Sequence, residues 1–142
     1  MTELRKATTE DLPTLLAIQS VSLESSWPEL LRVAIDGPPL VLVADNPPVG
    51  YALAIESTPT YLVELAVSPD HRNRGYGSSL LRAVLARSDE CRVTTRADAE
   101  RVRRFYEHHG FRVTERLPGH YEGDDGLLLV YQPDSASRDS SS

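Results

Sequence analysis

One stretch of sequence decides the fold of this chain: Val63-Glu64-Leu65-Ala66-Val67-Ser68-Pro69-Asp70-His71-Arg72-Asn73-Arg74-Gly75-Tyr76-Gly77-Ser78-Ser79-Leu80-Leu81. It joins an apolar strand to a helix through a basic turn that contains glycines. The first turn of a helix leaves its backbone N–H groups without intrahelical partners, and the helix macrodipole adds positive charge there. Gly75 and Gly77 allow a close approach and unusual dihedral angles, and Arg72 and Arg74 add positive charge. The stretch therefore predicts a local site for a phosphate group.

Glycines at this spacing also occur in ordinary turns between a strand and a helix, so the pattern alone leaves both interpretations open. Two other phosphate-binding motifs are excluded. A P-loop requires a lysine, and no Lys follows Lys6. A dinucleotide fingerprint requires a third glycine and a distal acid, which this turn lacks.

Composition predicts a globular protein. With 142 residues, 40% of them hydrophobic and 25% charged, we expect one domain over residues 1–132 and a disordered Ser- and Asp-rich tail over residues 133–142. The net charge of −6 argues against nucleic acid as a partner. The acidic, lysine-poor composition fits either a high-salt environment or a codon bias.

The cellular context is inferred from what the sequence does not contain. It has no apolar run long enough to span a membrane and no signal peptide, which predicts a cytoplasmic protein without a membrane partner. Cys91 is the only cysteine, so an internal disulfide and a thiolate cluster for zinc are excluded, and we expect no metal. Cys91 is interpreted as a small buried core residue.

The remaining elements follow from hydrophobic periodicity and turn residues. Strands are expected over 4–7, 40–44, 49–55, 61–67, 92–95, 111–117 and 127–131. The last two are joined through 119–126, and the three strands from 40 to 67 should form an antiparallel meander. Helices are expected after Thr8 and Thr9, over 28–35, from Gly77 onward, and over 98–109 with Val102, Phe105 and Tyr106 pointing inward. A helix between the strand ending at Val67 and the one near Val93 implies a parallel pair.

These features resemble the GNAT acyltransferase superfamily, whose members transfer an acyl group from acyl-coenzyme A to an amine. The resemblance runs from Leu4 to Tyr131, and its strongest part is Arg72-Asn73-Arg74-Gly75-Tyr76-Gly77. A second part is Phe105-Tyr106-Glu107-His108-His109-Gly110-Phe111. The resemblance to this superfamily implies an α/β fold of the α+β kind, with a mixed, mostly antiparallel sheet of six to seven strands and about four helices. One parallel strand pair would be splayed at the acyl-coenzyme A site.

The resemblance also implies where the coenzyme binds. Its pyrophosphate would lie on the backbone amides of a short segment, and its pantetheine arm would pair with the preceding strand. Side-chain identity within the amide segment is then unimportant, because only the N–H groups are needed. The implied coenzyme-binding residues are Leu65, Ala66, Val67, Arg72, Asn73, Arg74, Gly75, Tyr76, Gly77 and Ser78, with acetyl-coenzyme A as the co-substrate.

Acylation of an amine needs a proton acceptor, because a primary ammonium has a pKa of about 10, and the thiolate leaving group departs more readily when it is protonated. By resemblance, Tyr106 protonates the thiolate; alternatively it is an aromatic core residue beside Phe105. Glu64 points away from Val63 and Leu65 on its strand and is the candidate base, acting directly or through water. Alternatively, Glu64 pairs with an arginine or binds substrate.

The predicted function is transfer of an acetyl group from acetyl-coenzyme A to a primary amine of a small molecule or a peptide. Two alternatives are a coenzyme-binding regulatory module without catalysis and an acetyltransferase of protein N-termini, such as those of ribosomal proteins. Acetyltransferases of ribosomal-protein N-termini have a glutamate and an asparagine where this chain has Thr94 and Ala99, which disfavours that alternative. The acceptor is not encoded in a motif, and the oligomeric state is open between a monomer and a homodimer.

Overall fold

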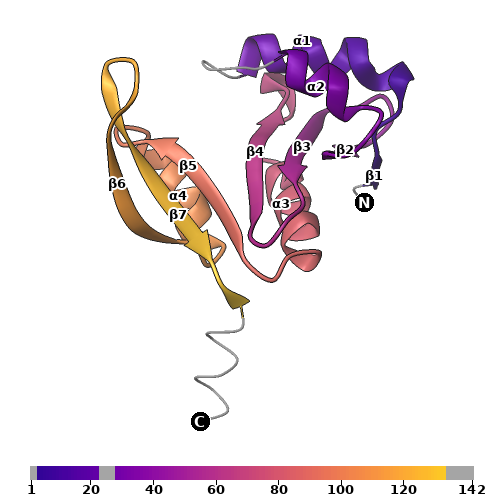
Figure 1. Ribbon diagram of the computed structural model, residues 1–142. Helices are drawn as coiled ribbons and strands as arrows, with labels where there is room; N and C mark the ends of the chain where they lie inside the picture. Colours follow the sequence, from indigo (N-terminus) through magenta and orange to yellow (C-terminus); the bar gives the residue numbers. More distant parts are fainter. Residues whose placement is uncertain (1–2, 23–27, 134–142) are drawn as a thin grey trace. The chain divides into compact units, whose positions relative to one another are not determined.

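The computed structural model describes residues 3–22 and 28–133, drawn in colour in Figure 1. They form two compact units, each described separately. The first contains residues 3–22, 28–57 and 62–87, and the second contains residues 58–61 and 88–133. Of the expected tail, residues 134–142 lie outside the described residues. Assignment of 1–132 as one domain stays a prediction.

The elements of the first unit follow the expected order. The strands are β1 (Leu4–Lys6), β2 (Leu40–Ala44), β3 (Gly50–Ile55) and β4 (Thr60–Val67), of which Thr60 and Tyr61 belong to the second unit. The α-helices are α1 (Leu12–Ser22), α2 (Pro28–Ala34) and α3 (Tyr76–Ala86). Two 3₁₀ turns, η1 (Thr9–Asp11) and η2 (Pro69–His71), precede α1 and α3.

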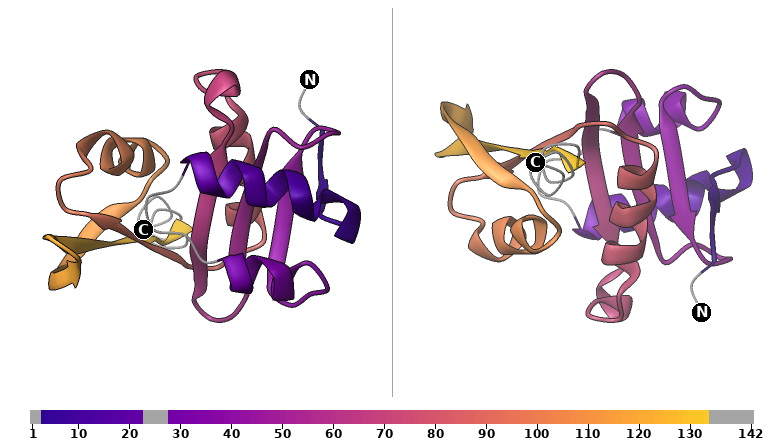
Figure 2. Two further views of the ribbon diagram at one scale, coloured as in Figure 1. Left: turned by 90° about the horizontal axis from the view of Figure 1, so that it is seen from above. Right: turned by 90° about the horizontal axis from the view of Figure 1, so that it is seen from below.

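Helices cover both faces of the strands in the first unit (Figure 2). On one face, α1 and α2 bury an apolar cluster with the odd-numbered residues of β2 and β3. On the other face, α3 packs against β3 and β2 through Leu80, Leu81 and Val84, which are all buried. The pairing of β2 with β3 is antiparallel, as the sequence predicts, and it places Leu40 opposite Ala54. The strands of this unit are therefore shielded on both faces, as their nearly continuous apolar sequences require.

The N-terminus of the helical segment is fixed by an ion pair. The Asp11 carboxylate accepts two hydrogen bonds from the Arg5 guanidinium, at 2.8 and 3.0 Å, and one from the backbone N–H of Thr8 at 2.8 Å. The hydrogen bond from Arg5 and then that from Thr8 outweigh burial and lower the pKa of Asp11 below its ordinary value. Asp11 therefore holds β1 and the start of α1 together as long as it is ionised.

We predict that Asp11→Asn lowers the free energy of unfolding by about 2 kcal/mol at neutral pH, because a charged hydrogen-bonded pair and a helix cap are lost. The folded-state pKa of Asp11 lies below the unfolded one, so its contribution is complete above the unfolded value of about 3.9. It is lost as the pH falls through the folded value. Urea unfolding of both proteins between pH 7 and pH 2 measures the effect.

A matched control is Glu56→Gln, which breaks an exposed ion pair. The side chains of Arg87 and Glu56 are 40% and 41% exposed, so that substitution should cost less than about 1 kcal/mol. If the difference in free energy of unfolding between wild type and Asp11→Asn persists undiminished at pH 2, the role assigned to ionised Asp11 is contradicted.

The second unit is an antiparallel sheet with one helix. It contains β5 (Cys91–Arg96), α4 (Glu100–His108), β6 (Arg112–Tyr121) and β7 (Asp124–Tyr131). β7 pairs with β5 on one side and with β6 on the other, both antiparallel. Cys91 is fully buried, as predicted, and lies in the core with the residues Val93, Tyr106, Phe111, Leu127, Leu129 and Val130.

Two predictions for this unit were wrong. Residues 119–126 were expected to form a connection, but β6 and β7 extend through them and leave only a two-residue turn at Glu122 and Gly123. Asp125 explains the extension: its carboxylate accepts hydrogen bonds from the Gly119 N–H and the Arg116 guanidinium, each at 2.8 Å, and these bridge an irregularity in the register. Val102 was expected to point inward but is 45% exposed, whereas Tyr106 is buried.

The order of strands in the sheet is β1-β2-β3-β4-β5-β7-β6. The predicted parallel pair is present: Thr60 lies opposite Cys91 and Tyr61 opposite Arg92. The predicted class, a mixed and mostly antiparallel sheet with four α-helices, is thus confirmed. No helix in the described part of the chain combines the length and apolar character of a membrane span.

Candidate functional site

The chain leaves β4 through a bend that hydrogen bonds hold in place. The Val67 carbonyl accepts hydrogen bonds from Arg72 Nε at 3.2 Å and from the Ser22 hydroxyl at 3.3 Å. The next amide, that of Ser68, donates to the Val49 carbonyl at 2.8 Å. The end of β4 is thus tied to α1, to the start of β3 and to its own following turn.

Two residues of the bend adopt a left-handed conformation, Asn73 with φ 64° and Gly75 with φ 87°. Gly75 meets the expectation of an unusual dihedral angle and precedes the first residue of α3. Gly77 does not meet it, since it is the second residue of α3 and has no positive φ. The left-handed backbone that was predicted for two glycines is therefore found at one glycine and at an asparagine, a residue that tolerates this region.

The start of α3 presents backbone donors. The first intrahelical hydrogen bond runs from the Ser79 N–H to the Gly75 carbonyl at 3.0 Å, so the amides of Tyr76, Gly77 and Ser78 precede it. Gly75 has no side chain to cap these amides, and residues 72–75 are exposed. Together with the charges of Arg72 and Arg74, these amides are the donors that the predicted anion site would use, and anion binding there stays a prediction.

The Tyr76 side chain has a contact that the sequence analysis did not anticipate. Its hydroxyl donates a hydrogen bond to the Asp45 carboxylate at 2.8 Å. The backbone N–H of Glu3 donates to the same carboxylate at 3.2 Å, and this bond, followed by that of Tyr76, lowers the pKa of Asp45. Asp45 lies in the turn between β2 and β3, so the first turn of α3 is anchored to that turn by a side chain.

Glu64 is buried in β4, on the same face as Leu62 and Ala66. Its Oε1 atom accepts hydrogen bonds from the Tyr51 hydroxyl at 2.8 Å and from the Gln19 amide at 2.9 Å. Sequence reasoning found Glu64 but missed both donors. The available signals were Gln19, a polar residue on the apolar face of a helix, and Tyr51, a tyrosine in an otherwise aliphatic strand.

Tyr106 belongs to the second unit and is 5% exposed. Its ring makes edge contacts with Phe105 and Phe111, at centroid distances of 5.3 and 5.2 Å. Burial is the main cause that raises the pKa of the Tyr106 hydroxyl above its ordinary value. The hydroxyl therefore stays protonated over the whole neutral range.

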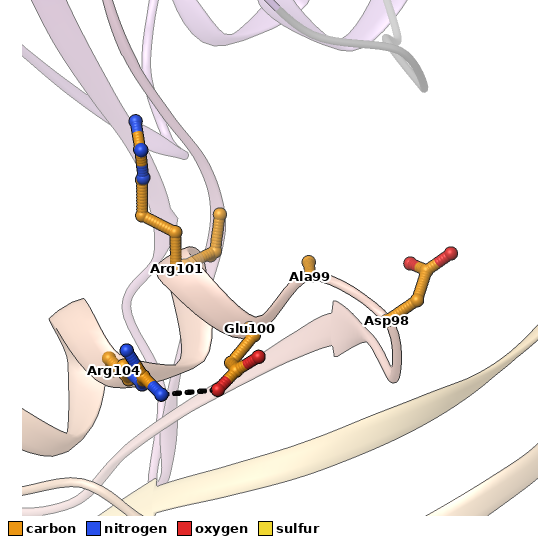
Figure 3. Close-up of a pocket in the computed structure, with 6 residues that line it drawn as sticks. Asp98, Ala99, Glu100, Arg101 and Arg104 are labelled. Carbon is orange, nitrogen blue, oxygen red and sulfur yellow. Dashed lines mark hydrogen bonds and ion pairs between the residues drawn. The ribbon is translucent and has the colours of Figure 1, made fainter.

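The N-terminus of α4 borders an open cavity of about 490 Å³ (Figure 3). Arg104 lies in this lining and forms an ion pair with Glu100, while Arg101 extends away from that pair. On the neighbouring strand, the Thr94 hydroxyl accepts a hydrogen bond from Tyr121 at 3.2 Å. Neither the cavity at the N-terminus of α4 nor the position of Thr94 on β5 contributes a buried carboxylate, so Glu64 stays the candidate base.

The structure brings most of the predicted residues into one unit. Glu64, the strand residues 65–67 and the bend 72–78 all belong to the first unit, and Tyr106 belongs to the second. Their catalytic and binding roles stay predictions. Within residues 3–22 and 28–133, no three His, Cys, Asp or Glu side chains lie together as a metal site would require.

Within a mixed sheet of this order, β4 thus runs into a bend lined by backbone amides, residues 72–78, which we call the amide-lined bend. Residues 37–113 match the family described as the acetyltransferase (GNAT) domain, which is more than half of the chain. The chain therefore belongs to the GNAT acetyltransferase family and is an acetyl-coenzyme A-dependent N-acyltransferase.

Relatives span almost the whole chain. An uncharacterized N-acetyltransferase of Methanocaldococcus jannaschii is 27% identical, covering 94% of this chain and 93% of the relative. The ribosomal-protein-S18-alanine N-acetyltransferase of Escherichia coli has a TM-score of 0.82 at 19% identity, covering 92% of this chain and 93% of its own. NAA60 of Arabidopsis thaliana with acetyl-CoA has a TM-score of 0.83 at 19% identity, covering 94% and 99%. The two structures show the shared fold.

Proposed function

We propose that this enzyme transfers the acetyl group of acetyl-coenzyme A directly to a primary amine, with Glu64 as the general base and Tyr106 as the general acid. The observation that carries the proposal is the place of Glu64. A buried carboxylate lies in the strand that leads into the amide-lined bend, three residues before its end at Val67. An acyl group held beside that strand would meet a proton acceptor.

The coenzyme would bind mainly through the backbone. Its diphosphate would accept hydrogen bonds from the amides of residues 73–78, at the positive end of α3. Its pantetheine arm would run along Leu65, Ala66 and Val67. The Val67 carbonyl already accepts two hydrogen bonds, so the arm would have to use other main-chain groups of this segment. Arg72 and Arg74 supply positive charge at the exposed rim.

The reaction balances with these two side chains. Glu64 takes a proton from the ammonium, and the neutral amine attacks the thioester carbonyl carbon. The C–S bond breaks as the tetrahedral intermediate collapses, and Tyr106 gives its proton to the departing sulfur. The acylated nitrogen loses its second proton, which restores Tyr106, and Glu64 releases its proton to water. The products are an amide, coenzyme A and one proton.

The acceptor is proposed as an amine of a small molecule or a peptide. A peptide amine is supported by the fold shared with the E. coli enzyme, whose name specifies an alanine of a ribosomal protein. Two residues separate this chain from such enzymes: the non-ionisable Thr94, whose hydroxyl accepts a hydrogen bond from Tyr121, and Ala99. We therefore propose the general class, an N-acetyltransferase of primary amines, over an enzyme of ribosomal protein N-termini.

The test is a panel of acceptors assayed for release of free thiol from acetyl-coenzyme A. The panel contains polyamines, amino acids, aminoglycosides and short peptides that differ in their first residue, each confirmed by mass spectrometry of the acetylated product. Amide formation on any primary amine supports the proposal. Transfer only to hydroxyl or thiol acceptors would refute it.

Loss of the anchor at Tyr76 should weaken coenzyme binding. We predict that Tyr76→Phe raises the Kd for acetyl-coenzyme A about three- to tenfold, because the variant loses the hydrogen bond to Asp45 that fixes the first turn of α3. Isothermal titration calorimetry measures the change. The matched control is Tyr61→Phe, an exposed tyrosine, whose Kd should equal that of wild type. An unchanged Kd in Tyr76→Phe would show that the anchor is irrelevant to binding.

A further inference from the structure

The first unit contains a buried polar cluster formed by Gln19 of α1, Tyr51 of β3 and Glu64 of β4. Gln19 is 2% exposed, Tyr51 0% and Glu64 6%. The neighbours on the same side of the strands are apolar and include Leu15, Ile18, Leu53 and Ala66. Burying polar groups here has a desolvation cost that an aliphatic core would not incur. A cluster of this kind calls for an explanation beyond stability.

Both donors converge on one atom. The Tyr51 hydroxyl and the Gln19 amide donate to the same Oε1 of Glu64, at 2.8 and 2.9 Å, from two different elements. Two fixed donors on one oxygen restrict rotation of the carboxylate about its terminal torsion, which is otherwise broad. They therefore define the direction in which Glu64 presents its lone pairs.

Neither donor is suited to exchange protons with Glu64 during turnover. Gln19 does not titrate, and burial together with the Glu64 charge raises the pKa of Tyr51, so its hydroxyl stays a donor at every working pH. The two side chains can hold the carboxylate without competing for the proton that it accepts.

The cluster also ties α1 to β4. Figure 2 shows α1 lying across the strands of this unit. The last turn of α1 is hydrogen-bonded to β4 at two places. Gln19 reaches Glu64, and Ser22, one turn further along, donates to the Val67 carbonyl at 3.3 Å. The orientation of the carboxylate thus depends on a helix as well as on its own strand.

We propose that Tyr51 and Gln19 are positioning residues that hold the Glu64 carboxylate in the orientation from which it accepts the proton of the amine. This inference rests on the proposed function of Glu64 as the general base. The two residues do not touch substrate and act only through Glu64.

The test is a double-mutant cycle measured on kcat with an accepted amine. Tyr51→Phe removes one donor and keeps the ring, and Gln19→Met removes the other and keeps the chain length. Each should lower kcat about 10- to 100-fold, as misplacement of a catalytic group by about 1 Å does. In the Glu64→Gln background, the same substitutions should lower kcat less than about twofold, because the group through which they act is gone.

If Tyr51 and Gln19 had only a structural role, their substitutions would lower kcat by the same factor in the wild-type and Glu64→Gln backgrounds, or would change only the melting temperature. Either result overturns the positioning role. If Tyr51→Phe does not fold, Gln19→Met gives the same comparison. Tyr61→Phe is the matched control and should leave kcat unchanged. If Glu64→Gln keeps wild-type kcat, the proposed function of Glu64 fails first, and this inference fails with it.

Discussion

The Glu64→Gln variant is expected to lose about 10²- to 10⁴-fold in kcat near neutral pH, the range that a general base contributes. Glutamine keeps an acceptor oxygen for Tyr51 and Gln19 but cannot take a proton. Near pH 7 almost all of a primary amine with a pKa of about 10 is protonated, so the reaction depends on a proton acceptor. Steady-state kinetics with a fixed amine at saturating acetyl-coenzyme A measures the loss.

The pH dependence of this defect is the sharper measurement. Above about pH 10 the amine is neutral without help, so wild type and Glu64→Gln should converge as the pH rises from 7 to 10. The melting temperature and the Kd for acetyl-coenzyme A control for misfolding and for loss of the coenzyme site. A defect of constant size at all pH values would assign Glu64 to substrate binding instead of proton transfer.

The Tyr106→Phe variant should lose about 10²- to 10³-fold in kcat, because the sulfur must then leave as an unprotonated thiolate. The ring and its contacts with Phe105 and Phe111 are kept, so the core of the second unit should stay intact. Kinetics with acetyl-coenzyme A and the best acceptor of the panel measures the loss.

A change of acyl donor distinguishes the two roles considered for Tyr106, that of a general acid and that of an aromatic residue that only packs in the core. A pantetheine thioester with a fluorinated, more acidic thiol has a better leaving group and needs less proton donation. The defect of Tyr106→Phe should therefore shrink with that donor. Tyr131→Phe, which removes a hydroxyl from the ring beside Phe111, is the control in the same unit and should behave as wild type with both donors. An equal defect with both donors would mean that Tyr106 does not protonate sulfur.

The sequence predicted the fold well where local signals and burial agree. The helix beginning after Thr8, the strand 40–44 and the parallel partner of the strand ending at Val67 are all present. Each combines an apolar repeat with a turn residue at its end, so periodicity and capping gave the same answer. The unusual dihedral angle of Gly75 before α3 was also predicted, because glycine adopts a positive φ without steric cost.

Other features depend on contacts between residues far apart in sequence. The extension of β6 and β7 requires Asp125 to bridge Arg116 and Gly119, and glycines near a turn give no sign of it. The donors of Glu64 are separated from it by 45 and 13 residues along the chain, and no local pattern pairs them. The side chain of Tyr76 was taken as interchangeable because its backbone alone was considered.

Other predictions await direct tests. They include the cytoplasmic location, the choice between a monomer and a homodimer, and the origin of the acidic surface. Dilution of the protein from high salt while folding is followed by circular dichroism would decide the last of these.

The central claim is that backbone donors in the segment 73–78 hold the diphosphate of the coenzyme and so bring its thioester to Glu64 and Tyr106. A crystal structure of the complex with acetyl-coenzyme A tests it most directly. We predict phosphate oxygens within hydrogen-bonding distance of these amides and the Tyr106 hydroxyl beside the sulfur. A diphosphate bound elsewhere, or a hydroxyl remote from the sulfur, would contradict the claim.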